Sequence, residues 1–340
     1  MIPHSRPVFD DLSLAALRDV LRSGHTVRGP VGQALEDRVA AFCGRPYGVA
    51  VDSGSSALML ALYALGIERP LRRVGLPAYA CRALLHAVRA CGAEPVFMDC
   101  ADDLRLDAAQ AEALAPTLDA VILNHPFGMI EPLVSSQWPC PVIEDMAQAA
   151  GGYLGDEVLG GFGDISIVSF YATKPWGGAY GGMVLSHRED VHGSVRSMRF
   201  ADAAGLTLPY AGNHQLSDLH AALAVCRLDR AEAEASKRRT LAGMYDSCMA
   251  DCNVQVVRRD AHGNHFRYIV RVRDADAALA TLRTHGVGAA LPVDVPLSRL
   301  LGQTCPGAES ARLQCVSLPL LADMSEEENE QMHKVISTCL

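Results

Sequence analysis

Short apolar runs alternate with longer amphipathic stretches along most of this chain, and the two patterns predict different elements. Consecutive apolar residues are typical of buried strands, whereas apolar residues at helical spacing are typical of helices. The runs predict strands at 47–51, 74–76, 94–98, 120–124, 142–143, 165–170, 183–186, 253–257, 265–272 and 315–318. Helical spacing and capping signals predict helices at 11–23, 31–42, 57–65, 82–91, 107–114, 221–245, 274–285 and 325–337. Strands that alternate with helices indicate an α/β protein.

The chain is long enough, at 340 residues, for a large core and two domains. From about Asp251 onward the predicted strands and helices become shorter, which marks a second region. We expect a large domain at 1–235, which includes the N-terminal helices, and a small domain at 236–340. A hydrophobic content of 49% and a charged content of 20% are ordinary for a globular α/β protein.

Charge and composition argue against several classes of partner. The net charge is −9 and no basic run is present, so neither nucleic acid nor an anionic membrane is an expected partner. No apolar stretch is long enough to span a bilayer, and the start of the chain lacks the features of a signal peptide. The eleven cysteines are scattered without a CxxC pair, which is typical of reduced thiols. We therefore expect a cytoplasmic protein.

One group of residues has the composition of a metal site. Cys248 and Cys252 are four residues apart on a predicted helix, and His262 and His265 follow ten residues later. The alternative, which we favour, is that these are ordinary helix and loop residues. No metal site is therefore predicted.

A single lysine follows the buried strand predicted at 165–170. Lys174 stands just before the glycines Gly177, Gly178, Gly181 and Gly182. Burial disfavours the charged ammonium, and a neutral lysine amine is a good nucleophile for carbonyl groups. Glycines let the backbone approach a flat or anionic ligand closely. The alternative is a surface lysine in a glycine-rich loop.

An acidic residue ends an earlier strand. Asp145 follows Val142 and Ile143, at a position where open α/β sheets bind ligands. Glu144 and Asp145 could also simply cap a turn. An aspartate and a lysine at strand ends match the needs of pyridoxal phosphate, whose ring nitrogen pairs with an Asp and whose aldehyde reacts with a Lys.

A small polar turn separates the strand at 47–51 from the helix at 57–65. It reads Asp52, Ser53, Gly54, Ser55, Ser56, so hydroxyl groups and free N–H groups of a helix start lie together. A plain serine N-cap is the alternative. Together with Lys174 and Asp145, the turn favours a phosphate site.

Two motifs carry a resemblance to a known family. VIEDMAQAAGG at 142–152 and GDISIVSFYATK at 163–174, followed by the glycines, resemble the DegT/DnrJ/StrS group of sugar aminotransferases. The resemblance covers nearly the whole chain. It implies the fold of the fold-type-I pyridoxal phosphate enzymes, in which a large cofactor-binding domain contains a mostly parallel seven-stranded sheet and a small C-terminal α/β domain follows.

The resemblance also implies roles for particular residues. Lys174 holds the cofactor as a Schiff base and moves the proton, and Asp145 keeps the pyridine nitrogen protonated. Gln148 hydrogen-bonds near the ring oxygen. The phosphate contacts are Ser55, Ser56 and Ser169. Asn213 matches a family asparagine that reaches the cofactor phosphate of the neighbouring subunit, which implies a homodimer with sites at the subunit interface.

Three positions qualify this picture. Cys81 occupies the place where family members commonly stack an aromatic ring on the cofactor, although Tyr79 is close. Ser298 replaces a family histidine that faces the substrate. His125 matches a family histidine near the cofactor, but a structural histidine is the stronger alternative.

The expected reaction is transfer of an amino group from L-glutamate or glutamine to a keto sugar, and the resemblance implies a nucleotide-linked keto sugar in amino-sugar biosynthesis. A sister branch, the sugar dehydratases, carries histidine in place of the lysine, and Lys174 argues against that branch. A pyridoxal-phosphate-dependent lyase, dehydratase or desulfurase on the same fold remains an alternative. A non-catalytic homologue that uses the fold for binding is a third hypothesis.

Overall fold

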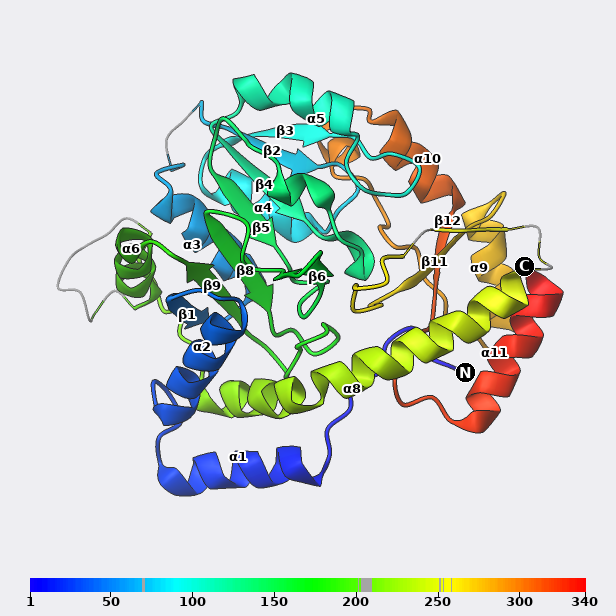
Figure 1. The fold of residues 1–340 in the computed structure, drawn as a ribbon, viewed down its shortest axis with the longest axis horizontal. Helices are drawn as coiled ribbons and strands as arrows, with labels where there is room; N and C mark the ends of the chain where they lie inside the picture. Colours follow the sequence, from blue (N-terminus) through cyan, green and yellow to red (C-terminus); the bar gives the residue numbers. More distant parts are fainter. Residues whose placement is uncertain (69–70, 201, 203–209, 251, 253, 258) are drawn as a thin grey trace.

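A computed structural model describes the chain except residues 69–70, 201, 203–209, 251, 253 and 258. The described residues form a central seven-stranded sheet in the order β1-β9-β8-β5-β4-β2-β3 (Figure 1). Only β9 runs antiparallel to its neighbours, so the prediction of a mostly parallel sheet is confirmed. The strands are β1 (Tyr47–Val51), β2 (Arg73–Pro77), β3 (Glu94–Met98), β4 (Ala120–Asn124), β5 (Val142–Asp145), β8 (Ile165–Ser169) and β9 (Gly182–Ser186).

The inner strands are buried along their full length. Every residue of β4, β5, β8 and β9 is buried, as expected for strands that helices cover on both faces. This explains why they are continuous apolar runs in the sequence. Around the sheet lie α2 (Pro30–Phe42), α3 (Gly54–Ala64), α4 (Arg82–Ala90), α5 (Ala108–Leu114) and α6 (Glu189–Arg199), whereas α1 (Asp11–Ser23) lies away from it.

A second, smaller sheet lies toward the C-terminus. It is antiparallel, in the order β10 (Gln255–Val256), β11 (Tyr268–Arg271), β12 (Cys315–Leu318). The same C-terminal part of the chain contains the helices α9 (Ala275–Thr284), α10 (Pro306–Gln314) and α11 (Glu326–Cys339). Short 3₁₀ helices at Ala115–Thr117, Pro126–Gly128, Pro132–Ser135 and Ser298–Leu301 join elements elsewhere.

Several sequence-based element predictions were wrong in detail. The helices α6 and α10 and the small hairpin of β6 (Tyr153–Leu154) and β7 (Glu157–Val158) were not predicted. The strand expected at 265–272 begins only at Tyr268, because His265 has a positive φ of 51° and the Asn264 side chain accepts the Phe266 N–H. The strand expected at 253–257 begins, among the described residues, at Gln255; residue 253 lies outside them.

The helix α8 (Asp218–Met249) extends beyond the predicted 221–245 at both ends. Ser217 is its N-cap, while Asp218 accepts the backbone N–H groups of Gly29, Val31 and Gly32 and so holds the start of α2. The first part of α8 packs against α2, and its last turns pack in the core of the small sheet. The expected division between residues 235 and 236 falls inside this helix, and the two-domain division stays a prediction.

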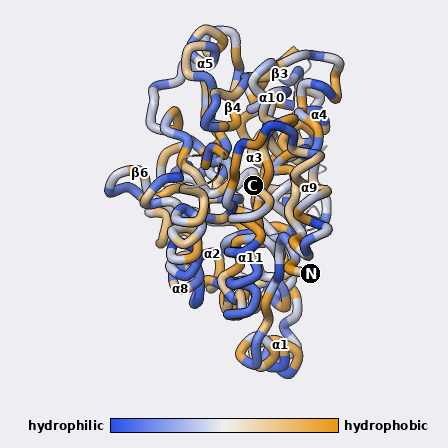
Figure 2. The backbone as a smooth tube through the Cα atoms, turned by 90° about the vertical axis from the view of Figure 1, so that its right-hand side faces the viewer, coloured by the Kyte–Doolittle hydropathy of each residue, from blue (hydrophilic) through white to orange (hydrophobic). Residues whose placement is uncertain are grey.

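The N-terminal helix α1 projects from the rest of the molecule (Figure 2). It packs along α8, yet Leu12, Leu14 and Leu21 are more than half exposed. Among the described residues no helix has the length and apolarity needed to cross a membrane. Among the described residues, no three or more histidines, cysteines and acids form a group that could hold a metal ion.

Candidate active site

A cavity of about 220 Å³ lies where several strands of the large sheet end. The last residues of β4, β5 and β8 line it, and the start of α3 closes one side. This is the edge at which open α/β sheets bind ligands. Of the predicted site residues, the cavity brings together Ser55, Cys81, Asp145, Gln148, Ser169 and Lys174.

Lys174 reaches the cavity from a tight loop, not from the strand itself. The strand β8 ends at Ser169, and Lys174 follows five residues later. The Lys174 N–H donates to the Tyr171 carbonyl, and its own carbonyl accepts the Gly177 N–H, both at 2.8 Å. A Cβ at Gly177 would lie 2.1 Å from the Tyr171 carbonyl oxygen, so only glycine fits this turn.

Burial is the main influence on the pKa of Lys174 and shifts it toward the neutral amine. Burial lowers the pKa of Lys174, although the neighbouring Cys81 and Asp145 act to raise it, and Arg267 lowers it further. A neutral amine is the nucleophilic form of lysine. The chemistry expected from the sequence is therefore available at this position.

Asp145 is a buried carboxylate with room for one more partner. Its Oδ1 accepts the Ala147 N–H at 2.9 Å, and no described residue donates to its second oxygen. Burial raises the pKa of Asp145, while the Ala147 hydrogen bond, Lys174 and His125 counteract this rise. A cationic donor in the cavity would stabilise the ionised carboxylate.

His125 lines the cavity and is held by two hydrogen bonds. Its Nδ1 accepts the Glu131 N–H at 3.0 Å, so its Nε2 donates to Glu144 Oε1 at 3.2 Å. Burial acts to raise the pKa of Glu144, but this bond and the N–H groups of Gly160 and Gly163 hold it below its usual value. The ring of His125 is thus fixed by the protein, as the structural alternative expected.

The start of α3 forms a cup of donors. Ser53 caps the helix, and its Oγ accepts the Ser56 N–H at 3.1 Å. Ser53, Gly54 and Ser55 line the cavity, with Ser169 packed against Gly54 from β8. The N-terminal N–H groups of a helix bind anions well. Ser56 instead turns its hydroxyl toward Ser53 at 2.9 Å and does not line the cavity.

Gln148 has one end of its side-chain amide already engaged. Its Oε1 accepts the Phe127 N–H at 2.7 Å. The amide nitrogen therefore remains as a donor for a ligand oxygen in the cavity.

Cys81 and Tyr79 lie in different places, although the chain separates them by only one residue. Cys81 is exposed at the start of α4 and lines the cavity. Tyr79 is buried, and its ring packs edge-on to that of Phe127 at 6.0 Å. Between these two candidates, only Cys81 can contact a ligand in the cavity.

Asn213 does not line the cavity of its own chain. Its side chain is exposed and accepts a hydrogen bond from Gln215 at 3.0 Å. Its expected role toward a neighbouring subunit stays a prediction.

Other residues of the cavity were not predicted from the sequence. Ser53, Asn124, Tyr171 and Tyr180 all line it. Tyr171 and Tyr180 are 49% and 53% exposed, and their rings meet edge-on at 5.8 Å at the mouth. The signals were their positions: Ser53 lies in the small polar turn, Asn124 ends a strand, and the two tyrosines flank Lys174 and its glycines.

Comparison with known proteins gives consistent matches. The family model for the DegT/DnrJ/EryC1/StrS aminotransferase family matches residues 8–337. The chain is similar to the aminotransferase TlmJ from Streptoalloteichus hindustanus, with 26% identity, a TM-score of 0.91, and coverage of 99% of this chain and 98% of that chain. It is also similar to DesV from S. venezuelae, solved in complex with a ketimine intermediate, with 25% identity, a TM-score of 0.87, and 98% coverage of both chains.

A third match is to a Streptococcus pneumoniae protein assigned as a sugar aminotransferase and solved in its PLP form. The identity is 22% and the TM-score is 0.91, over 99% of this chain and 98% of that chain. At this identity the likeness establishes the fold, and the fold-type-I prediction is confirmed.

Proposed function

The chain belongs to the DegT/DnrJ/EryC1/StrS aminotransferase family, and from this premise we propose that it is a pyridoxal-phosphate-dependent sugar aminotransferase. The single observation that carries the proposal is the meeting of Lys174 and Asp145 at one cavity beside the start of α3. The S. pneumoniae protein was solved in PLP and PMP forms, the two states that a transaminase cofactor alternates between.

The cavity fits pyridoxal phosphate at three of its polar groups: the ring nitrogen, the phosphate and the ring oxygen. The second oxygen of Asp145 suits the protonated ring nitrogen, and the cup of Ser53, Gly54 and Ser55 suits the phosphate. The free amide nitrogen of Gln148 suits the ring oxygen. When bound, the cofactor supplies an electron sink for the carbon that loses its proton.

Lys174, Asp145 and His125 have different roles in the proposed reaction. Lys174 provides the amine that binds the cofactor and then acts as general base and acid. Asp145 would stabilise the positive charge on the protonated ring nitrogen of the cofactor. His125 is a positioning residue, because its N–H donates to Glu144 and its backbone N–H donates to the Asp145 carbonyl at 3.1 Å.

The identities of the amino donor and of the amino acceptor are part of the proposal. We propose L-glutamate or glutamine as the donor and a keto sugar, attached to a nucleotide, as the acceptor. Ser298, which replaces a family histidine, is buried and does not line the cavity. The position of Ser298 therefore gives no support for a substrate contact by this residue in the cofactor cavity.

We also propose a homodimer in the cytoplasm. The exposed tyrosines at the cavity mouth and the exposed Asn213 support a site completed by a second copy. The exposed leucines of α1 supply apolar surface for such an interface. All eleven cysteines are unpaired, which is consistent with a reducing compartment.

An absorbance spectrum tests the proposal. Purified protein mixed with pyridoxal phosphate should give a visible band that L-glutamate or glutamine converts to a near-ultraviolet band, and Lys174→Ala should show no such conversion. A band that neither donor shifts would favour a lyase on the same fold. Without any cofactor band, the cofactor assignment and the role of Lys174 would both be lost.

A further inference from the structure

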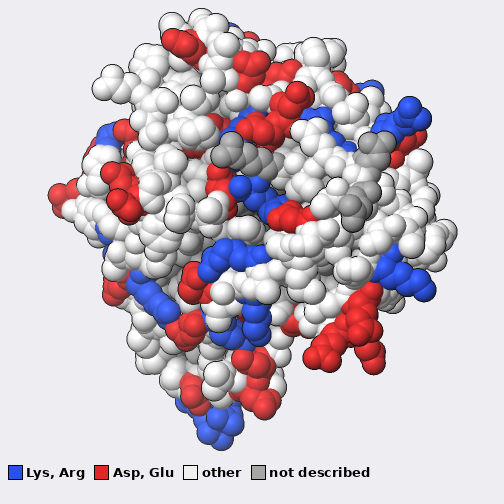
Figure 3. Space-filling model, turned by 45° about the vertical axis from the view of Figure 1, so that its right-hand side comes forward, with Lys and Arg blue, Asp and Glu red and all other residues white. Residues whose placement is uncertain are grey.

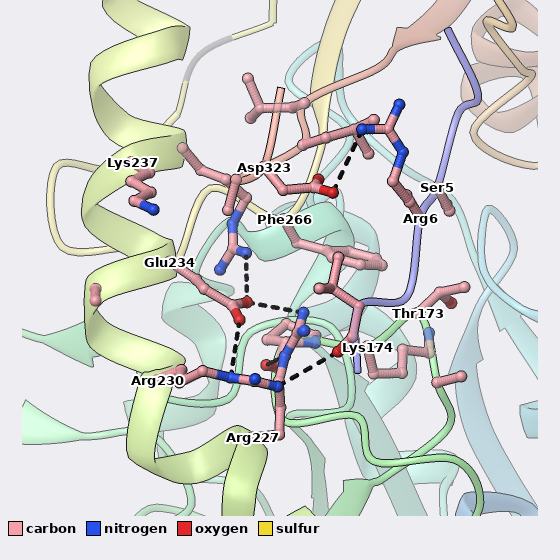
Figure 4. Close-up of a pocket in the computed structure, with 18 of the residues that line it drawn as sticks. Ser5, Arg6, Thr173, Lys174, Arg227, Arg230, Glu234, Lys237, Phe266 and Asp323 are labelled. Atoms are coloured by element: carbon pink, nitrogen blue, oxygen red, sulfur yellow. Dashed lines mark hydrogen bonds and ion pairs between the residues drawn. The ribbon is translucent and has the colours of Figure 1, made fainter. Parts of the chain in front are cut away.

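Two further cavities lie on either side of the residues that follow β8. The second cavity, of about 320 Å³, is lined by Lys174 and by Glu234 and Lys237 of α8 (Figure 4). The third cavity, of about 470 Å³, lies between α2, α8 and the segment after β5. Lys174 does not line it, but the next two residues, Pro175 and Trp176, do. The third cavity is therefore separate from the cofactor cavity, and it is the larger of the two.

Aromatic side chains form much of the wall of the third cavity. Trp176 is only 3% exposed, whereas Phe42 and Tyr153 are 45% and 38% exposed. Trp176 is thus an inner wall, and the other two rings lie toward the opening. The rings of Phe42 and Trp176 meet edge-on at 5.1 Å, and Val39 and Leu228 add aliphatic surface. Such a wall favours a ligand with a flat apolar body.

Trp176 has an unused hydrogen-bond donor. Its indole nitrogen lies 3.3 Å from the position that a Cβ would take on Gly151, which lines the same cavity. No described residue accepts the indole N–H, although the side chain is almost fully buried. In contrast, the Trp138 indole N–H donates to the Leu133 carbonyl at 3.0 Å. Buried donors are normally paired, and a ligand oxygen in the third cavity would supply the missing acceptor.

A buried arginine brings positive charge to the third cavity. The side chain of Arg238 is 7% exposed, and burial lowers its pKa to about 10, so it stays charged at neutral pH. Its Nε donates to the Asn264 carbonyl at 3.2 Å. Its carboxylate neighbour, Glu234, is 3.8 Å away and lies closer to Arg227, at 2.8 Å. Other N–H groups of Arg238 are therefore open to an anion, which would offset the cost of burying this charge.

The remaining charges of the lining limit the charge of a ligand. Arg38 is paired with Asp229 at 2.6 Å, and the exposed Glu232 is paired with Arg239 at 2.5 Å. Figure 3 shows that basic side chains on one face of the molecule also lie close to acidic ones. A ligand with several negative charges would find one open cation, Arg238, and repulsion from Glu232. The lining therefore suits an anion with a single charge.

The third cavity is connected to the cofactor cavity through short stretches of chain. Trp176 stands two residues after Lys174 in the same loop. Asn264, which lines the third cavity, donates to the Gln148 carbonyl at 3.0 Å. A molecule in the third cavity would thus contact the segments that hold two residues of the cofactor cavity, without reaching the cavity itself.

We propose that the third cavity binds an aromatic acid, a flat apolar ring that carries one carboxylate. The ring lies against Trp176, Phe42 and Tyr153, and the carboxylate accepts N–H groups of Arg238 and Trp176 at the inner wall. Because Lys174 does not line this cavity, the acid is neither the amino donor nor the acceptor of the proposed reaction. The site goes beyond the proposed function and does not depend on it.

Calorimetric titration of the protein loaded with pyridoxal phosphate tests the proposal, with 3-phenylpropanoate as the probe. We expect it to bind about tenfold or more tightly than 3-phenylpropanamide, which lacks the charge, and than propanoate, which lacks the ring. Arg238→Gln should remove the preference for the acid over the amide. Ala231→Leu should weaken binding of the acid by filling the cavity from α8. Ser236→Leu, an exposed change on the same helix outside both further cavities, is the matched control.

Each outcome supports or overturns the proposal. Equal affinity for the acid and the amide in the wild type overturns it, and this comparison together with Ala231→Leu decides if Arg238→Gln does not fold. If Lys237→Gln weakens binding and Ala231→Leu does not, the acid occupies the second cavity, because Lys237 lines only that one. If the acid does not bind but Ala231→Leu changes the sedimentation mass, a second copy of the chain covers this face. Repeating the titration without cofactor keeps the test independent of the cofactor assignment.

Discussion

Single residues show how the protein controls proton chemistry. Asp145 and Lys174 lie at one cavity, and burial shifts their pKa values in opposite directions, up for the carboxyl and down for the amine. Each shift favours the neutral group, while the attraction between the two groups works against both shifts. A bound cofactor would supply the cationic partner that Asp145 lacks and would take up the amine of Lys174.

The lowered pKa of Lys174 leads to a pH prediction. The protonated amine cannot attack an aldehyde, so the rate of pyridoxal phosphate capture by cofactor-free protein should rise with pH as Lys174 loses its proton. It should level off below the ordinary lysine value of 10.5, because burial lowers this pKa. Stopped-flow absorbance across a pH series measures the inflection.

The same series tests the neighbouring carboxylate. Asp145 acts to raise the pKa of Lys174, so Asp145→Asn should move the inflection to lower pH. The exposed Asp156→Asn is the control and should leave it unchanged. An inflection at or above 10.5 in the wild type would contradict the prediction.

At the scale of elements, close backbone contact shapes the phosphate cup. The first residue of β9, Gly182, pairs with Ser169 at the end of β8 and packs on the start of α3. A Cβ at Gly182 would lie 2.5 Å from the Ser53 carbonyl carbon and oxygen and 2.6 Å from the Gly54 nitrogen. These are backbone atoms and cannot move away as a flexible side chain can. The glycine therefore fixes how near α3 lies to the sheet.

Substitution of this glycine should damage the site and the fold together. Gly182→Ala should push the start of α3 outward, lower stability by about 1–3 kcal/mol and weaken pyridoxal phosphate binding. Thermal unfolding and a spectroscopic cofactor titration measure the two effects.

A second glycine provides the control. Gly193 lies inside α6 with open space around its Cβ position. Gly193→Ala should stabilise the protein by about 0.5–1 kcal/mol and leave cofactor binding unchanged. If both variants behaved alike, close packing at Gly182 would not explain the cup.

At the scale of the whole molecule, α8 joins the two sheets. Its start holds α2 through Asp218, its middle lines the second cavity, and its last turns lie in the small core. The second cavity is thus lined by segments that come before and after this helix in the sequence. Figure 1 shows α8 running from the large sheet to the small one. Both the second and the third cavity therefore depend on the position of this one helix.

The proposed homodimer leads to a complementation prediction. Lys174→Ala and Asn213→Ala should each be inactive, or nearly so, when purified alone. If Asn213 serves the neighbouring subunit, a mixed dimer has one complete site, formed by Lys174 of one chain and Asn213 of the other. Random mixing after reversible dissociation should restore about one quarter of wild-type activity. Assays of the mixture and of each variant alone measure this recovery.

The recovery distinguishes the two arrangements. If Asn213 acted within its own chain, every mixed dimer would lack a complete site and the mixture would stay inactive. Mixing Lys174→Ala with Asp145→Asn is the matched control, because both residues line one cavity of one chain and no complete site can form.

Much of this protein could be predicted from local sequence. The buried strands are continuous apolar runs because helices cover both of their faces, and these runs located β4 and β8 almost to the residue. The motifs around Asp145 and Lys174 indicated the family and the cofactor, because the chemistry of pyridoxal phosphate demands those residue types. The helix α6 was not predicted, although its buried Val191, Val195 and Met198 have helical spacing, because these three apolar residues stand among polar ones and a glycine interrupts the helix.

Only the tertiary structure decided which side chains meet. Ser55, Cys81, Asp145 and Lys174 are far apart in sequence and gather at one cavity because parallel strands end at the same edge of a sheet. Nothing local to Arg238 distinguishes it from the exposed arginines of the chain. Its burial at the third cavity follows from how α2 and the segment after β5 lie against α8. Residue types and their spacing can be read from the local sequence, whereas the burial of a side chain, the charges around it and its distance to other side chains depend on the whole fold.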